Sequence, residues 1–226
     1  MATFGEISEP SSRTAWEDWD EDYTIENSSR LQLDKDVEVT EVDTLVILEG
    51  KYLSMCIKSQ KDLEIINSIK DINMKLFKSK SQNNYFCVIH NYDLVWSSEI
   101  VQLLKPWIVA SKNVVAILTK PLVDYQVTEQ VTQDCVIRGL YTTKSKSLGP
   151  EYPNIEFPRL EQPNMISGVA AGAIALREIL ELPATAVVCY IQHHNVYELQ
   201  RLLEKFKVIP HVDTDHNDLM NSNLYI

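Results

Sequence analysis

Short apolar runs that alternate with amphipathic segments constrain the fold of this 226-residue chain more than any other feature. An unbroken apolar run is typical of a strand that is buried on both faces of a sheet. The predicted strands cover residues 45–48, 85–90, 114–118, 135–141 and 185–191. Strands that alternate with helices predict an α/β three-layer sandwich with a mixed central sheet flanked by helices.

The first third of the folded part is predicted from weaker patterns. Val37, Val39 and Val42 alternate with polar residues, which indicates an edge strand, and Tyr52–Ile57 is predicted to return as a strand after a turn at Gly50. Apolar residues at helical spacing then predict a helix over 60–78, with a stripe of Leu63, Ile66, Ile69, Ile72 and Leu76.

Three further helices are predicted. The first follows a cap at Ser97 or Ser98, and Pro106 is expected to end or kink it near Lys105. The second runs from a cap at Ser167 to Leu182, and its small residues are expected to let it sit close on the sheet; they are Gly168, Ala171, Gly172 and Ala175. The third covers 195–206, with Val196, Leu199, Leu203 and Phe206 on one face.

Charge divides the chain into regions. Residues 1–43 hold thirteen acidic and three basic residues, whereas residues 44–226 are nearly neutral. We therefore expect a disordered acidic N-terminal tail over 1–36, an α/β domain over 37–210, and a flexible C-terminal tail over 211–226. The acidic stretch 16–23 contains aromatic residues, so it is either a ligand motif for a basic groove or a solvating tail.

Several classes of protein are not expected from this composition. The longest apolar runs have eight residues, too few to cross a membrane, and the N-terminus lacks the pattern of a signal peptide. The four cysteines have no metal-ligand spacing and are predicted to be core residues of a reduced, cytosolic protein. A polyanionic N-terminus also disfavours nucleic-acid binding.

Few residues suggest catalysis or metal binding, and no cofactor is expected. His193 and His194 follow a predicted strand, where α/β folds place ligands, but no third ligand stands at helical or hairpin spacing, which favours an exposed strand-end loop. The segment 211–218 imitates the start of a calcium loop but lacks its glycine and its terminal glutamate. Four lysines form a basic patch that is either a solvated helix face or a surface for an acidic partner: Lys70, Lys75, Lys78 and Lys80.

The last three residues, Leu224, Tyr225 and Ile226, follow a polar stretch. They are either frayed residues or a tethered hook, in which Leu224 and Tyr225 fill an apolar groove and the carboxylate of Ile226 meets a lysine or backbone N–H groups. A buried tyrosine contributes at most ~4–6 kcal/mol, from which the ordering of the tail subtracts. A hook therefore needs a second contact from the folded body.

Three places in the sequence carry a resemblance to the chaperone 1 branch of the proteasome α-ring assembly chaperones. They are the opening residues 1–6, the block Leu160-Glu161-Gln162-Pro163-Asn164 with the helix and strand that follow it, and the ending Asn223-Leu224-Tyr225-Ile226. The similarity covers about residues 160–226, and over 44–159 only the order of the elements and scattered residues such as Asp124-Tyr125 agree. Ile226 replaces the threonine that is usual at the last position.

This resemblance implies a chaperone without enzymatic activity, in the cytoplasm and also the nucleus. It implies a phosphorylase-like fold without an active site and a heterodimer with proteasome assembly chaperone 2. The heterodimer would promote assembly of the α-ring and prevent off-pathway ring dimers. Leu224, Tyr225 and Ile226 would dock in a pocket between proteasome α-subunits. Two other functions stay open: a phosphorylase- or hydrolase-type enzyme that uses His193 and His194, and an adaptor that works through residues 16–23.

Overall fold

The computed structural model describes residues 31–58, 62–127, 135–145 and 157–192. One seven-stranded mixed sheet forms the centre of this part of the chain, in the order β2-β3-β4-β1-β5-β7-β6. The strands are β1 (Val42–Glu49), β2 (Leu63–Ile69), β3 (Asn73–Ser79), β4 (Asn84–His90), β5 (Ser111–Pro121), β6 (Cys135–Tyr141) and β7 (Ala184–Ile191). The four neighbours β4, β1, β5 and β7 run parallel, and their carboxyl ends share one edge, the carboxyl edge.

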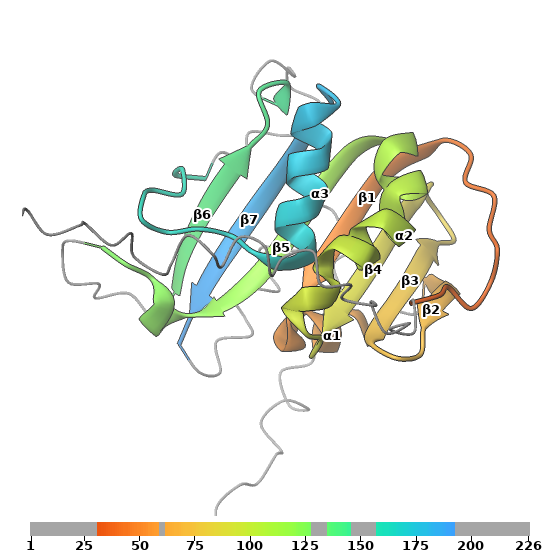
Figure 1. The fold of residues 1–226 in the computed structure, drawn as a ribbon, viewed down its shortest axis with the longest axis horizontal. Coiled ribbons are helices and arrows are strands. Elements are labelled where there is room, and N and C mark those ends of the chain that lie inside the picture. Colours follow the sequence, from red (N-terminus) through yellow and green to blue (C-terminus); the bar gives the residue numbers. More distant parts are fainter. Residues whose placement is uncertain (1–30, 59–61, 128–134, 146–156, 193–226) are drawn as a thin grey trace, which may run out of the picture. The chain divides into compact units, whose positions relative to one another are not determined.

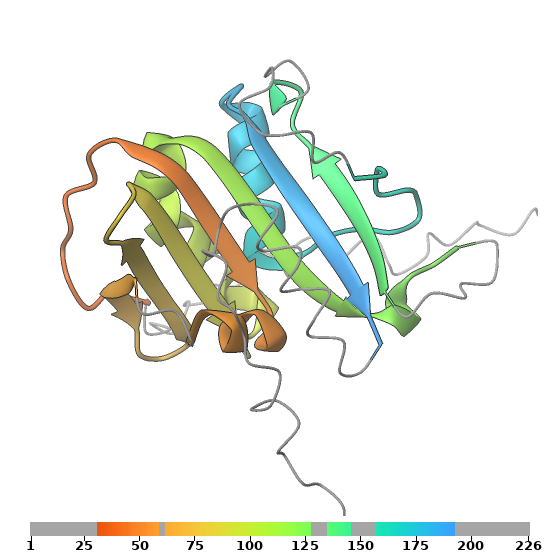
Figure 2. The same cartoon turned by 180° about the vertical axis from the view of Figure 1, so that it is seen from behind.

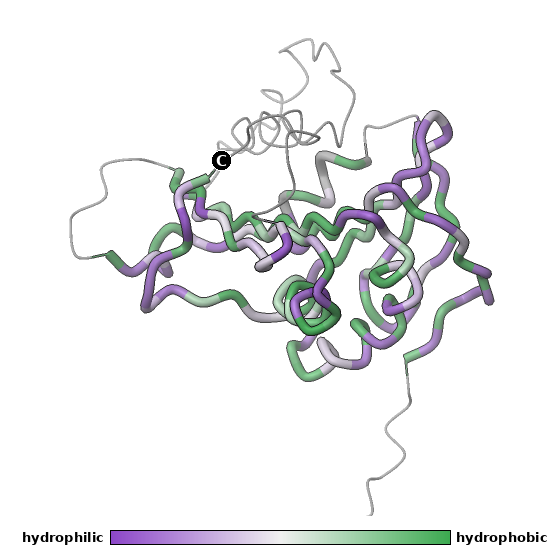
Figure 3. Tube along the Cα trace, turned by 90° about the horizontal axis from the view of Figure 1, so that it is seen from above, coloured by the Kyte–Doolittle hydropathy of each residue, from purple (hydrophilic) through white to green (hydrophobic). Residues whose placement is uncertain are grey.

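Helices cover both faces of this sheet, as the three-layer prediction requires. Helices α2 (Ser97–Ala110) and α3 (Gly168–Ile179) pack side by side on the front face (Figure 1). Helix α1 (Lys51–Lys58) belongs to the opposite, rear face, where Leu53 and Ile57 join the buried cluster. The hydropathy view shows hydrophobic residues concentrated along the strands between these layers (Figure 3).

Alternating side chains of each central strand supply the two cores. Leu45 and Ile47 of β1 point to the front core with the residues of α2 and α3, whereas Val46 and Leu48 point to the rear core. All four side chains are buried, which explains why these strands are apolar without interruption. The five strands predicted from apolar runs are confirmed as β1, β4, β5, β6 and β7.

The weaker predictions at the start of the domain are wrong. Residues 37–41 form no strand, and β1 begins at Val42. Residues 52–57 belong to helix α1 instead of a returning strand. Leu53 and Ile57 lie one helical turn apart and are both buried, so a single apolar face stabilises this short helix.

The helix predicted over 60–78 is instead the antiparallel hairpin of β2 and β3. A bulge shifts the pairing between Ile65 and Asn67, and the turn that follows holds Ile72. These two irregularities space the apolar residues by three and four, which imitates a helical stripe. Pairing of β3 with β4 adds the hairpin to the sheet.

The other helix predictions need corrections at their ends. Helix α2 continues through Pro106 to Ala110, because Leu104, Trp107 and Ile108 are buried against the sheet and their burial outweighs the lost hydrogen bond. Asp93 caps the short 3-10 helix η2 (Leu94–Trp96) before α2, in place of a serine cap.

Helix α3 ends at Ile179, and the Ser167 side chain makes no capping bond. Its small residues do not face the sheet as predicted: Ala175 is exposed, and a Cβ on Gly172 would lie 2.8 Å from Cγ2 of Val101 in α2. Gly172 therefore permits close packing between the two helices, while a different set of residues, among them Val169, Ala173 and Ile174, is buried in the core.

The segment before β1 contacts the body earlier than the predicted boundary at residue 37. Leu31 is buried in the front core, and its backbone N–H donates to the carboxylate of Glu99 at 2.6 Å. The side chain of buried Asn67 both accepts from the N–H of Lys35 and donates to its carbonyl. Residues 31–36 thus follow the edge of β2 instead of belonging to a separate tail.

Candidate functional site

Most residues that the sequence singles out for function lie outside the described part of the chain. These are the acidic segment 16–23, His193 and His194, the segment 211–218, and the terminal residues Leu224, Tyr225 and Ile226. Among the described residues, no group of three histidine, cysteine or acidic side chains could hold a metal ion. No described helix is long and apolar enough to cross a membrane.

The carboxyl edge is where open α/β sheets bind ligands, and here a carboxylate of the chain itself occupies the position above β1. Glu49 ends β1, and its carboxylate accepts hydrogen bonds from the Tyr92 hydroxyl at 2.5 Å and from the N–H of Ala170 at 2.8 Å. The Tyr92 oxygen accepts in turn from the N–H of Val169 at 3.0 Å. Two N–H groups in the first turn of α3 are thereby satisfied without any ligand.

Gly168 makes this contact possible. Its φ of +80° is a conformation that other residues rarely adopt, and a Cβ there would come within 2.1 Å of Oε1 of Glu49 and 2.4 Å of the Tyr92 oxygen. Burial raises the pKa of Glu49, and the hydrogen bonds from Tyr92 and Ala170 offset that rise only in part. The helix end that would attract an anionic ligand is filled by a partly buried carboxylate.

The block Leu160–Asn164 forms a second polar cluster, near the outer edge of the sheet. Arg138 of β6 forms an ion pair with Glu161, with Nε 2.9 Å from Oε2, and donates a second bond to the Tyr125 hydroxyl at 2.6 Å. Tyr125 also donates to Glu161, and its ring lies 4.9 Å from the ring of Tyr190 in β7. The cluster therefore ties β6, β7 and the segment after β5 together.

Burial alone would raise the pKa of Glu161, but the hydrogen bonds from Tyr125 and Arg138 together outweigh it and lower the pKa. Asn164 completes the block by holding Gln126 as a strand neighbour would: it accepts from the Gln126 N–H and donates to its carbonyl. The N–H of Leu160 donates to the carbonyl of Gly139 and so covers part of the β6 edge. The recognisable sequence block thus has a structural role in these contacts.

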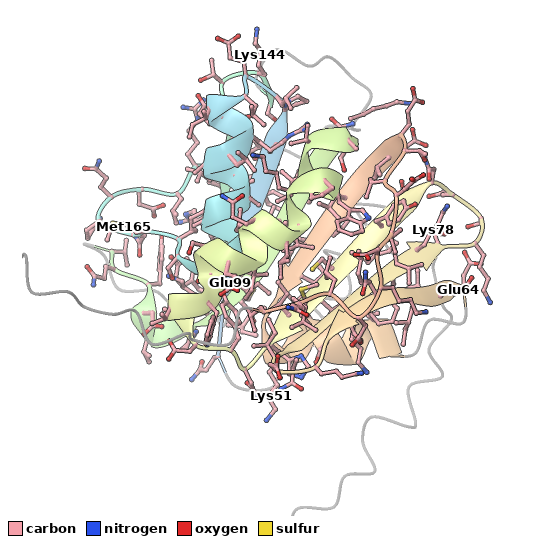
Figure 4. The ribbon with its side chains drawn as sticks, turned by 45° about the vertical axis from the view of Figure 1, so that its right-hand side comes forward. Lys51, Glu64, Lys78, Glu99, Lys144 and Met165 are labelled. Atoms are coloured by element: carbon pink, nitrogen blue, oxygen red, sulfur yellow. The ribbon has the colours of Figure 1, made fainter. Side chains whose placement is uncertain are left out.

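The basic patch lies on the hairpin of β2 and β3 and not on a helix face. Lys70 pairs with Asp34 at 3.2 Å, and the Nζ of Lys78 lies 5.4 Å from the centre of the Tyr85 ring. Glu64 is the register partner of Lys78 across the hairpin (Figure 4). Two of the four lysines therefore have partners within the chain, which weakens the patch as a surface for an acidic protein.

Sequence reasoning missed Arg177, the most buried charged side chain in the described part of the chain. It has no exposed surface, and its five N–H donors bond to the carbonyls of Ile108, Ser111, Lys112 and Pro183 at 2.8–3.2 Å. Burial lowers its pKa to about 10. An arginine in an otherwise small and apolar helix was the only signal in the sequence.

The prediction that the cysteines are core residues is confirmed for Cys87 and Cys189. Cys87 is buried in the front core and Cys189 in the rear core, and Cys135 is half-buried. Burial strongly raises the pKa of Cys87 and of Cys189, which suppresses their reactivity as thiolates. Cys87 and Cys189 are free thiols.

Comparison of the sequence with known proteins finds no match among family models or curated proteins. Solved structures do match. PbaA of Pyrococcus furiosus, an archaeal homologue of proteasome-assembly chaperone, is 9% identical with a TM-score of 0.58, over 80% of this chain and 88% of that one. PbaB of the same organism, an archaeal proteasome activator, is 9% identical with a TM-score of 0.56, over 81% and 91%.

A Thermoplasma acidophilum protein of unknown function has a TM-score of 0.52 at 8% identity, over 76% of this chain and 80% of that one. At these identities the similarity concerns the fold. The chain is thus an α/β protein with the fold of the archaeal proteasome-assembly chaperone homologue PbaA.

Proposed function

We propose that this chain is a non-enzymatic proteasome assembly chaperone that has the role of chaperone 1. Together with proteasome assembly chaperone 2 it would form a heterodimer on the assembling α-ring, in the cytoplasm and nucleus, and prevent off-pathway ring dimers. The observation that carries the proposal is the fold shared with PbaA. The block 160–164 and the ending Leu224-Tyr225-Ile226 support the same family from the sequence.

The anchor in this proposal is Tyr225, with Leu224 as its apolar neighbour and the Ile226 carboxylate as partner of a lysine in the pocket between α-subunits. A tyrosine ring buries much apolar area at a small entropic cost. The contact is weak by itself, so the folded body must bind nearby and raise the effective concentration of the tail.

The alternative enzyme on this fold would place His193 and His194 beside an anion-binding pocket. The occupation of the α3 N-terminus by Glu49 argues against such a pocket, because a substrate phosphate would have to displace a carboxylate of the chain. A turnover assay with nucleosides plus phosphate, and with esters, tests the alternative directly.

Capture of purified proteasome α-rings on the immobilised heterodimer tests the proposal. We expect deletion of 224–226, or Tyr225→Ala, to weaken capture at least tenfold, equivalent to about 1.4 kcal/mol. Asn221→Ala, in the same tail, is the matched control and should leave capture unchanged. Capture that survives the deletion would remove the role of the tail, and absence of capture by the intact chain would remove the function.

A further inference from the structure

The rear side of strand β7 is buried without a described helix over it. Val187, Cys189 and Ile191 of β7 point to this face and are at most 5% exposed. Helix α1 packs on β4, β1 and β5, and the rear view shows no helix of the described chain over β7 and β6 (Figure 2). Phe157 packs against this rear cluster and is the only described side chain between β6 and α3 that does so.

The width of a helix and the spacing of the strands show why α1 cannot also cover β7. Strands lie about 4.8 Å apart, so β4 and β7 are separated by roughly 14 Å across β1 and β5. A helix is about 10 Å wide with its side chains and therefore covers about two strands. Side chains at 0% exposure on β7, such as Val187 and Cys189, require a second covering element.

We propose that residues 195–206 of this chain are that element and dock on the rear face over β7. The described chain stops at Gln192, one residue after β7, so the segment begins beside the uncovered strand. Its apolar residues Val196, Leu199, Leu203 and Phe206 are spaced by three and four, as on one face of a helix. Twelve helical residues span about 18 Å, which fits within the roughly 26 Å of the eight-residue strand.

Two consequences follow for binding, and they rest on the proposed function of the tail. A segment that returns along β7 from the carboxyl edge brings residue 211 toward the opposite edge of the sheet. The tail with Leu224, Tyr225 and Ile226 would then start from the amino ends of the parallel strands. The rear face would also be used by the chain itself, so a second chaperone must bind to the front helices or to an edge.

Thiol labelling of the full-length chain tests the docking, because each face carries its own reporter. Cys189 is buried on the rear face and Cys87 on the front face. In Leu199→Asp and in Leu203→Asp, we expect alkylation of Cys189 under native conditions to accelerate at least tenfold while Cys87 stays protected, as read by peptide mass spectrometry. Arg201→Gln, on the side of the predicted helix opposite Leu199 and Leu203, changes the charge by the same one unit; it is the matched control and should behave like the unmodified chain.

Equal labelling of both cysteines would mean that the whole fold opens, in which case Leu199→Ala and Leu203→Ala provide milder versions of the same test. Cys189 that stays protected in all four variants would overturn the proposal. Protection that depends on protein concentration would also overturn it, since a second copy would then be the cover. The measurement needs no α-ring, so its result is independent of the capture assay on Tyr225.

Discussion

The two ends of helix α3 are fixed by side chains of opposite charge: partly buried Glu49 at its start and fully buried Arg177 near its end. At its start, the Glu49 carboxylate accepts from an N–H of the first turn, and near its end the Arg177 guanidinium bonds to backbone carbonyls. Both arrangements match the helix dipole, which favours an anion at the N-terminus and a cation at the C-terminus. Burial opposes both charges: it raises the pKa of Glu49 and lowers that of Arg177.

The two ends differ in whether an uncharged side chain could make the same hydrogen bonds. Arg177 joins α2, β5 and the turn before β7, because its guanidinium donates to four backbone carbonyls at once, which no uncharged side chain can do. Glu49 joins α3 to β1 and Tyr92 through contacts that a neutral amide could partly imitate. The comparison teaches that a charged side chain has a structural role where several backbone groups depend on it for hydrogen bonds. A charged side chain at the carboxyl edge of the sheet is therefore not functional by its position alone.

The largest expected effect is that of Arg177→Ala. It leaves several buried carbonyls without donors and opens a cavity, so we expect the free energy of unfolding to fall by at least ~3 kcal/mol. Arg177→Lys keeps the charge with fewer donors and should lose less. Urea denaturation measures both variants, and a loss below ~1 kcal/mol for Arg177→Ala would break the contrast between the two helix ends.

Gly168→Ala should follow, with a loss of about 2 kcal/mol or more. The variant forces a positive φ on alanine and pushes a Cβ into Glu49 and Tyr92. Gly172→Ala, in the same helix, is the matched comparison: its Cβ would also come close to a neighbour, 2.8 Å from Cγ2 of Val101, but without the positive φ of Gly168 and with the higher helix propensity of alanine. Thermal unfolding of both variants should place Gly168→Ala clearly lower, and equal melting temperatures would contradict the close approach.

Glu49→Gln should change how the free energy of unfolding depends on pH more than it changes the value of that free energy at low pH. Because the pKa of Glu49 is raised in the folded chain, that chain holds more protons than the unfolded chain between the two pKa values. The stability of the unmodified protein therefore falls as the pH rises from about 4.3 through the folded pKa. Denaturation at a series of pH values should show this contribution absent from Glu49→Gln, and parallel curves would refute it.

The smallest effect belongs to the partly exposed ion pair of Glu161 and Arg138. Glu161→Gln should cost within ~1 kcal/mol, because solvent screens the pair. The sign of its pH dependence is opposite to that of Glu49: the pKa of Glu161 is lowered, so its contribution is present at neutral pH and is lost as the pH falls through the folded pKa. Denaturation of Glu161→Gln at neutral and acidic pH, with Glu161→Asp as the conservative control, measures both features.

Much of the central sheet could be predicted because its strands are buried on both faces. Runs such as Val114–Leu118 allow few other arrangements, and β5 contains that run as expected. The hairpin of β2 and β3 could not be predicted, since a bulge and a turn converted the two-residue period into an apparent helical one. The helix end predicted near Lys105 was wrong for a related reason, because core contacts around Pro106 outweigh the tendency of proline to end a helix.

The candidate functional residues also divide into those that the sequence suggested and those that only the structure revealed. The terminal residues Leu224, Tyr225 and Ile226, and the family that they suggest, follow from the sequence alone and lie outside the described residues. No local pattern could reveal the Glu49 contact with α3, because its partners are 121 positions apart in the chain.

By itself, the sequence determined five of the seven strands and the overall α/β class, because hydrophobic burial leaves a periodic pattern along the chain. Only the tertiary structure decided which polar side chains meet. A charged side chain withdrawn from solvent is stable only where hydrogen-bond partners from several elements converge. The Tyr92 hydroxyl and the Ala170 N–H do so at Glu49, and four backbone carbonyls do so at Arg177.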